Sequence, residues 1–114
     1  PLAKGMLSGK YFGEDAKKLT DDDLRYERYN RQETIDGLSK LPQLSFLATP
    51  ERSMVQASLR YVLDHPGVSC VIAGAKNSRQ IEENAVSSDL PPLSEADLDR
   101  ALPIAETIRT PGWI

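Results

Sequence analysis

Two cations and a glycine lie close together in the second half of the chain, in an order that suits phosphate binding. Gly74 follows a short apolar run, and Lys76 and Arg79 lie at the expected start of a helix. The first N–H groups of a helix are unpaired and carry the positive end of its dipole, so they attract anions. A glycine lets a ligand approach the backbone closely. The pattern indicates a phosphate site, although an ordinary solvated βα turn would have the same local sequence.

The elements on either side of this turn can be predicted from their residues. Asn77 is a suitable N-cap, and Gln80 three residues later completes a box of the Asn-x-x-Gln kind. The preceding run, residues 69–73, is short and apolar, as is typical of a buried parallel strand. Cys70, the single cysteine, lies in this run and is expected to be a buried small side chain.

Most of the remaining chain is predicted to be helical. Asp21 to Asp23 follow Thr20 in a helix-start pattern, which we interpret as a solvated first turn rather than a metal site. Apolar residues then recur at helical spacing, and Pro42 is expected to interrupt that helix. The residues predicted to face the core there are Ile35, Leu38, Leu41, Leu44 and Leu47.

Two further helices have clear start signals. Ser53 and Gln56 form a capping box, and this helix is expected to end at His65, the single histidine, for which we expect a structural role. Ser94 and Asp97 are expected to start the last helix.

Composition narrows the class of protein. The 114 residues are 39% hydrophobic and 27% charged, with a net charge of −3, as in an ordinary globular protein without a nucleic-acid partner. A metal site is not expected. There is no transmembrane span and no signal-peptide pattern, so we expect a cytoplasmic protein without a membrane partner.

Four segments carry a resemblance to a known family. They are PLAKGMLSGKY at residues 1–11, SMVQASLRYVL at 53–63, HPGV at 65–68 and VIAGAKNSRQIEEN at 71–84. In this order they resemble the C-terminal part of the aldo-keto reductases, in the branch with bacterial aldo-keto reductases and potassium-channel β-subunits. The resemblance implies an α/β fold, the C-terminal quarter of a (β/α)8 TIM barrel. Such a barrel needs roughly 250 residues.

The whole chain, residues 1–114, is therefore expected to be a segment of the barrel and not a complete domain. It would run from the end of strand seven, at Pro1 to Ala3, through strand eight at residues 69–73, to the C-terminal helix and tail. Alone, this piece is expected to be mostly helical.

The resemblance also implies that NADPH is the cofactor. Residues matching Pro1, Leu2, Ala3 and Lys4 line the pyrophosphate, and Lys10 reaches a phosphate. Gly74 would lie under the adenosine phosphate, and Lys76 and Arg79 would bind the 2′-phosphate. Gln80, Glu83 and Asn84 match positions that contact adenine. Phosphate sites on such barrels are commonly formed by the loops after the last two strands together with a helix N-terminus.

The chemical step has no predicted residues in this chain. Family enzymes transfer hydride from NADPH to a carbonyl while a Tyr donates a proton, assisted by a Lys, an Asp and a His from earlier strands. None of the tyrosines, Tyr11, Tyr26, Tyr29 and Tyr61, stands in the matching motif. We predict no catalytic residue, and we expect the chain alone to be inactive.

Two functions remain open. The first is the NADPH-binding segment of an oxidoreductase that reduces aldehydes or ketones, with a small carbonyl compound as substrate. The alternative is a non-enzymatic helical module that associates with a protein, or with itself, through surfaces that the missing barrel would cover.

Overall fold

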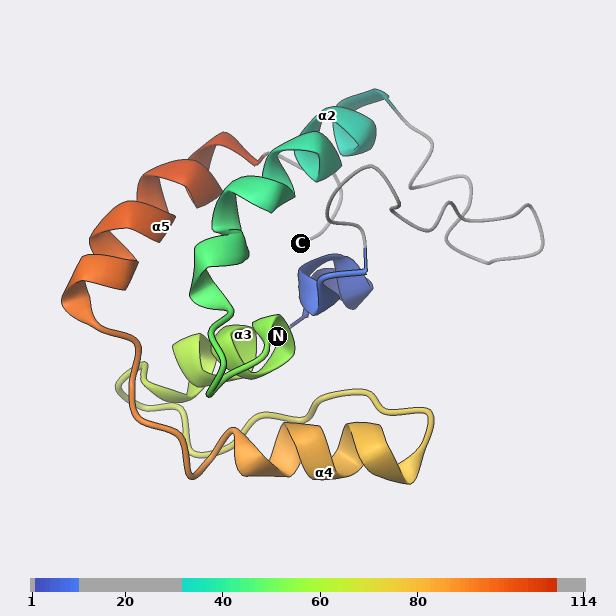
Figure 1. Cartoon of the computed structure of the whole chain (residues 1–114), viewed down its shortest axis with the longest axis vertical. Coiled ribbons are helices and arrows are strands. Elements are labelled where there is room, and N and C mark those ends of the chain that lie inside the picture. The colour runs from blue at the N-terminus through green and yellow to red at the C-terminus, as the bar shows by residue number, and fades with distance from the viewer. Residues whose placement is uncertain (1, 11–31, 109–114) are drawn as a thin grey trace.

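The structure is a computed structural model, and it describes residues 2–10 and 32–108 (Figure 1). The elements in chain order are η1 (Ala3–Ser8), α2 (Gln32–Lys40), η2 (Leu41–Leu47), α3 (Met54–Leu63), α4 (Ser78–Val86) and α5 (Glu95–Thr107). The two η elements are 3-10 helices. Within the described residues there is no strand, and the only β contact is an isolated bridge between Thr49 and Arg52. The expectation of a mostly helical piece is confirmed for this part of the chain.

The core is formed by η1, η2, α3 and α5. Leu41, Leu44 and Leu47 are buried, and their spacing of three matches the three residues per turn of a 3-10 helix. They therefore lie on one side of η2, against buried residues of the other elements and of the segment between α4 and α5. Those residues are Met6, Met54, Ala57, Leu93 and Ala101.

Pro42 interrupts the helix as predicted, because α2 ends at Lys40 and η2 begins with Pro42 in its first turn. The prediction that Ile35 faces the core is wrong, since its side chain is 43% exposed. Ile35 lies in the first half of α2, and the packing of α2 within the described residues is mainly against η2 at its other end. Helical spacing indicates which residues share a face of the helix, but it does not show whether another element covers that face.

Helix α5 is attached to the core by charged side chains as well as by apolar ones. Arg52 Nη2 lies 3.1 Å from Asp97 Oδ2, and Arg52 Nε donates to Leu47 O at 2.8 Å. The Arg100 guanidinium lies 3.8 Å from the centre of the Phe46 ring, within range of a cation–π contact. The hydrogen bond from Arg52 is the main reason that the pKa of Asp97 lies below its ordinary value.

Helix α4 differs from the other elements because none of its residues is buried. It packs on α3, and Figure 1 shows it at the edge of the molecule with the preceding segment running alongside it. Ile81 and Val86, its larger apolar side chains, are 60% and 46% exposed. Apolar burial therefore contributes little to the position of α4.

Neither predicted strand is a strand where the structure describes its residues. Residues 69–73 make no backbone hydrogen bond within the described residues, and Ala3 begins η1 instead of ending a strand. The prediction that Cys70 is buried is wrong as well, because Cys70 is exposed and the neighbouring Ile72 is 89% exposed. A parallel strand needs neighbouring strands for its ladder, and the described residues supply none.

Several expectations lie outside the described residues, among them Pro1, the helix start at Asp21 to Asp23, and the tyrosines Tyr11, Tyr26 and Tyr29. None of the helices that the structure describes is long and apolar enough to cross a membrane. The same residues form no group of three or more His, Cys, Asp or Glu side chains around a metal position.

Candidate functional site

The start of α4 is capped as the sequence predicts, with one change in the partner. Asn77 has extended backbone angles, and its Oδ1 accepts a hydrogen bond from Gln80 N at 3.0 Å. The Gln80 side chain does not return to the Asn77 N–H. Its Oε1 accepts from Lys76 N at 2.7 Å, so the box closes one residue earlier. This bond fixes the backbone of the turn that carries Lys76.

Two backbone donors stay available at this helix start. The N–H groups of Ser78 and Arg79 have no acceptor among the described residues, whereas Asn77 already satisfies that of Gln80. The side chains of Lys76 and Arg79 are both exposed. The two cations and the two free donors lie within four consecutive residues. This arrangement is suited to a phosphate.

The turn before α4 is open on the side of Gly74. Gly74 O accepts from Asn84 Nδ2 at 3.4 Å, which links the turn to the second half of α4. A Cβ built on Gly74 would meet no heavy atom within 4 Å. The packing of the described residues therefore does not require a glycine there, and the missing Cβ leaves space for a ligand.

Glu83 makes contacts that the sequence did not predict. Its Oε1 accepts from Ser53 Oγ at 2.6 Å, and its backbone oxygen accepts from Gln56 Nε2 at 3.3 Å. Ser53 and Gln56 also form the predicted capping box of α3. The sequence signal revealed the cap, but nothing in the local sequence connected it to a residue 30 positions later.

A second polar link lies at the C-terminal end of α4. Arg60 Nη1 donates to Ser87 O at 3.4 Å and to Ser88 O at 3.1 Å, and the same side chain pairs with Asp64. Arg60 thus donates hydrogen bonds to carbonyl groups that would otherwise be unsatisfied at a helix end. Sequence reasoning did not single it out, because its partners are distant in the chain.

The candidate residues near the N-terminus are less fully described. Leu2 and Ala3 lie at the start of η1 and are half-buried, while Lys10 is exposed and its N–H donates to Ser8 Oγ at 3.4 Å. Pro1 and the Lys4 side chain lie outside the described part. No hydrogen bond or ion pair joins these residues to the 74–84 group within the described residues. The structure therefore brings together Gly74, Lys76, Arg79, Gln80, Glu83 and Asn84, and gives no contact between them and the N-terminal set.

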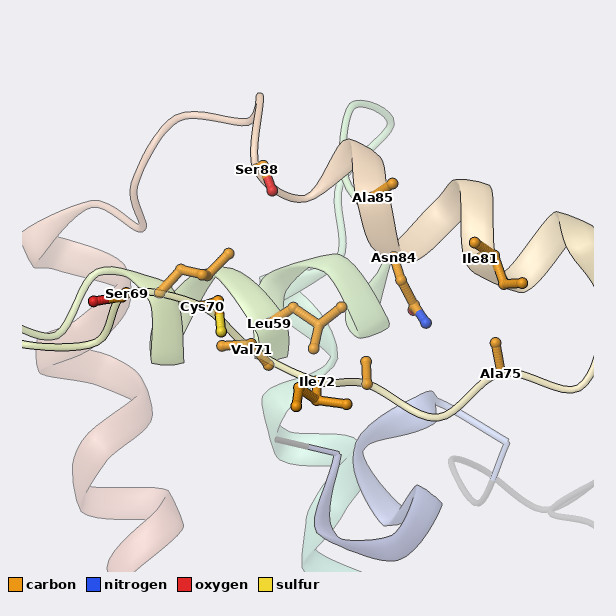
Figure 2. Close-up of a pocket in the computed structure, with 12 residues that line it drawn as sticks. Leu59, Ser69, Cys70, Val71, Ile72, Ala75, Ile81, Asn84, Ala85 and Ser88 are labelled. Atoms are coloured by element: carbon orange, nitrogen blue, oxygen red, sulfur yellow. The ribbon is translucent and has the colours of Figure 1, made fainter.

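A cavity of about 440 Å³ lies between α3, α4 and residues 69–75. Figure 2 shows Leu59 entering from α3, Ile81 and Asn84 from α4, and the extended segment along the opposite side. Asn84 points toward that segment, in keeping with its bond to Gly74 O. Most of the residues that line the cavity are of apolar types, among them Leu59, Val71 and Ile81.

His65 and Tyr61, whose side chains are of types that can act in acid–base chemistry, contact each other. His65 Nδ1 lies 2.9 Å from Tyr61 O, and the His65 and Tyr61 rings meet edge to face at 4.8 Å. His65 follows the end of α3 and bonds a carbonyl of its last turn, as a structural histidine does. Among the described residues, Tyr61 is the only tyrosine, and the side chain it meets is this structural histidine.

Comparison with known proteins identifies the family of the chain. Residues 1–105 match the model of the aldo/keto reductase family. The match covers well over half of the chain, so the chain belongs to the aldo/keto reductase family, and the resemblance seen in its motifs is confirmed.

Three curated relatives are similar over most of the chain. It is 28% identical over 98 residues to the uncharacterized oxidoreductase YqkF of Bacillus subtilis (strain 168), covering 86% of the chain and 30% of that protein. It is 35% identical over 100 residues to a probable voltage-gated potassium channel subunit beta of Arabidopsis thaliana, covering 82% and 29%. It is 32% identical over 88 residues to L-glyceraldehyde 3-phosphate reductase of Escherichia coli O157:H7, covering 74% and 25%.

The chain thus spans between 25% and 30% of the length of these relatives. No solved structure matches the chain significantly.

Proposed function

We propose that this chain is the NADPH-binding segment of an oxidoreductase that reduces aldehydes or ketones to alcohols. The observation that carries the proposal is the start of α4, where Lys76 and Arg79 lie beside two backbone N–H groups that have no acceptor among the described residues. A 2′-phosphate at this position would receive charge-assisted hydrogen bonds from the side chains and the backbone together. Membership of the aldo/keto reductase family supports a nicotinamide cofactor.

The rest of the site fits the adenosine part of such a cofactor. Space beside Gly74 admits a phosphate close to the backbone. Gln80, Glu83 and Asn84 follow on α4 with amide and carboxylate groups that can pair with the polar edge of adenine. We assign Leu2, Ala3, Lys4 and Lys10, together with Pro1, to the pyrophosphate side. When bound, NADPH supplies the hydride.

The same proposal specifies the fold of the complete protein and the part of it that would carry the catalytic residues. Residues 1–114 would be the last quarter of a (β/α)8 barrel, in which residues 69–73 form a strand between neighbours supplied by the rest of the protein. The Tyr, Lys, Asp and His needed for proton transfer would lie in that part, so this chain alone should not reduce a carbonyl compound. The complete protein would be cytoplasmic.

The alternative, a helical association module, rests on the exposed apolar segment. Ile72 is 89% exposed, and the backbone groups of residues 69–73 have no hydrogen-bond partner in the part of the chain that the structure describes. Such a segment favours pairing with another chain, including a second copy. The absence of cofactor binding together with a stable oligomer of the 114-residue chain would favour this function.

The test uses Lys76→Ala and Arg79→Ala, made separately in the complete enzyme that carries this segment. Dissociation constants for NADPH and NADH are measured by fluorescence titration at fixed salt, because salt screens exposed charges. Losing one charge-assisted hydrogen bond should weaken NADPH about ten- to a hundredfold. NADH lacks the 2′-phosphate and should change little. If both cofactors weaken equally, or if neither does, the 2′-phosphate assignment fails.

A further inference from the structure

Glu83 is distinctive among the candidate cofactor residues. Within the described part of the chain, it is the only one whose side chain bonds to a different helix. The bond, from Ser53 Oγ to Glu83 Oε1, is 2.6 Å long, which is in the ordinary range for the charge-assisted bond that a hydroxyl donates to a carboxylate. The other carboxylate oxygen has no hydrogen-bond partner among the described residues.

Ser53 performs two separate tasks with one hydroxyl. Its oxygen accepts from Gln56 N at 3.2 Å, which caps α3, and its O–H donates a hydrogen bond to Glu83 Oε1. A cap needs only an acceptor, so the donor contact is not explained by capping. The Gln56 side chain adds a third link, to the Glu83 backbone.

These links matter because α4 has little else to fix it. None of its residues is buried, so its orientation on α3 depends on polar contacts at Glu83 and near Ser87. A shift of α4 would carry Gln80 and Asn84 with it. Those two side chains in turn hydrogen-bond the turn at Lys76 and Gly74.

We propose that Ser53 is a positioning residue for the adenosine end of the nucleotide cofactor. It orients the Glu83 carboxylate, so that one oxygen is occupied and the other is available to accept a hydrogen bond from an adenine amino group. It also fixes α4 with respect to α3. This inference rests on the proposed function, because it assumes that Glu83 and its neighbours bind NADPH.

The effect on cofactor binding that we expect from changing Ser53 differs from the effect that we expect from changing Lys76 or Arg79. Adenine is common to NADPH and NADH, so loss of the Ser53 contact should weaken both cofactors alike. Loss of a contact to the 2′-phosphate should weaken only NADPH. The two sets of variants therefore report on different parts of the same site.

The experiment uses three substitutions in the complete enzyme. Ser53→Ala removes the cap and the donor, Ser53→Asp keeps a capping acceptor but removes the donor, and Ser53→Thr keeps both. Ser53→Ala and Ser53→Asp should each weaken NADPH and NADH about three- to tenfold, whereas Ser53→Thr should stay within about twofold. Ser94→Ala, which removes the cap of α5 and touches no residue of α4, is the control. It should lower the unfolding temperature and leave both dissociation constants unchanged.

A double-mutant cycle with Glu83→Ala separates positioning from general loss of structure. If Ser53 acts through Glu83, adding Ser53→Ala to Glu83→Ala should weaken cofactor binding by less than about twofold further. Full additivity would overturn the inference. So would a Ser53→Asp variant that binds as tightly as the unsubstituted enzyme, or a Ser94→Ala variant that loses as much as Ser53→Ala.

Failure of the proposed function gives a different result. In that case the unsubstituted enzyme binds neither cofactor, or binds both without any effect of Lys76→Ala and Arg79→Ala. If the unsubstituted enzyme binds neither, the positioning role of Ser53 is overturned together with the site. If it binds both and only the 2′-phosphate assignment fails, the Ser53 series decides the inference by itself.

Discussion

The contacts of α3 belong to two regions of the molecule that are built differently. On one side, η1, η2 and α5 share a core with α3 through buried leucine, methionine and alanine side chains. On the other side, α4 is attached by hydrogen bonds from Ser53, Gln56 and Arg60, with no buried residue in α4. The turn before α4 is linked to this helix by the side chains of Gln80 and Asn84. Gly74, Lys76 and Arg79, the candidate residues for the 2′-phosphate end of the cofactor, lie in the second region.

This difference suggests which contacts hold the site in place. Regions with few buried apolar contacts open at lower free energy than the core, and ligand-binding segments are often drawn from them. A few polar contacts can fix the geometry of such a site, but each of them matters individually. The core region, by contrast, should respond to the volume of its side chains.

The largest expected effect distinguishes the two regions directly. Leu41→Ala should destabilise the protein by about 2–5 kcal/mol, because the Leu41 side chain is 1% exposed and would leave a cavity. Ile81→Ala in α4 should change the free energy of unfolding by less than about 1 kcal/mol, since Ile81 is 60% exposed. Urea denaturation at fixed protein concentration measures both. Equal losses for the two variants would contradict the contrast between the regions.

The next effect tests the polar attachment of α4. Arg60→Ala removes the donors to Ser87 O and Ser88 O and the pair with Asp64, and should cost about 1–2 kcal/mol. The loss should be local, because no core side chain is touched. Amide hydrogen exchange should therefore accelerate across residues 78–88 more than in η2.

Arg60→Lys is the matched control for that variant. It retains the positive charge but lacks the planar fork that reaches several acceptors at once, so it should recover only part of the protection. An acceleration of exchange that is uniform along the chain would show that Arg60 supports the whole fold and not α4 alone.

A smaller effect concerns the charged attachment of α5, and it depends on pH. The pKa of Asp97 is lowered, mainly by its hydrogen bond from Arg52, with a contribution from Ser94. A lowered pKa in the folded state stabilises the fold above the unfolded value of 3.8, and this stabilisation is lost as the pH falls through the folded pKa. The pair is partly exposed, with Asp97 29% accessible, so we expect at most about 1 kcal/mol.

Asp97→Asn provides the comparison for this titration. The variant should be less stable near neutral pH and should lose less stability than the unsubstituted protein as the pH falls below about 4. Parallel stability curves for the two proteins from neutral to acid pH would contradict the role of this pair.

The smallest effect on stability is expected at Gly74. Gly74→Ala should change the free energy of unfolding by less than about 1 kcal/mol, because the added Cβ meets no protein atom within 4 Å. Cofactor affinity should nevertheless fall, if a phosphate approaches this backbone. Gly67→Ala is the control, since Gly67 has a φ of +86°, and an alanine there should be strained by about 1 kcal/mol without affecting the cofactor. Unchanged cofactor affinity of Gly74→Ala would remove the glycine from the site.

The sequence by itself determined the local features of this protein. Asn77, Ser53 and Ser94 were predicted as N-caps and each accepts the backbone N–H three residues later. A cap bond spans three residues, so its information is contained in a short stretch of sequence. The ordered motifs also identified the family and placed Gly74, Lys76 and Arg79 at one turn.

Only the tertiary structure decided which distant residues meet. The hydrogen bond from Ser53 to Glu83 and the reach of Arg60 to Ser87 depend on how α4 lies on α3, which no local pattern encodes. The apolar run at 69–73 predicted a buried strand, yet Ile72 is exposed because burial and pairing require neighbouring strands that the described residues do not contain. A sequence pattern indicates which kind of neighbour a segment can pair with, but the segment pairs only where the tertiary structure supplies that neighbour.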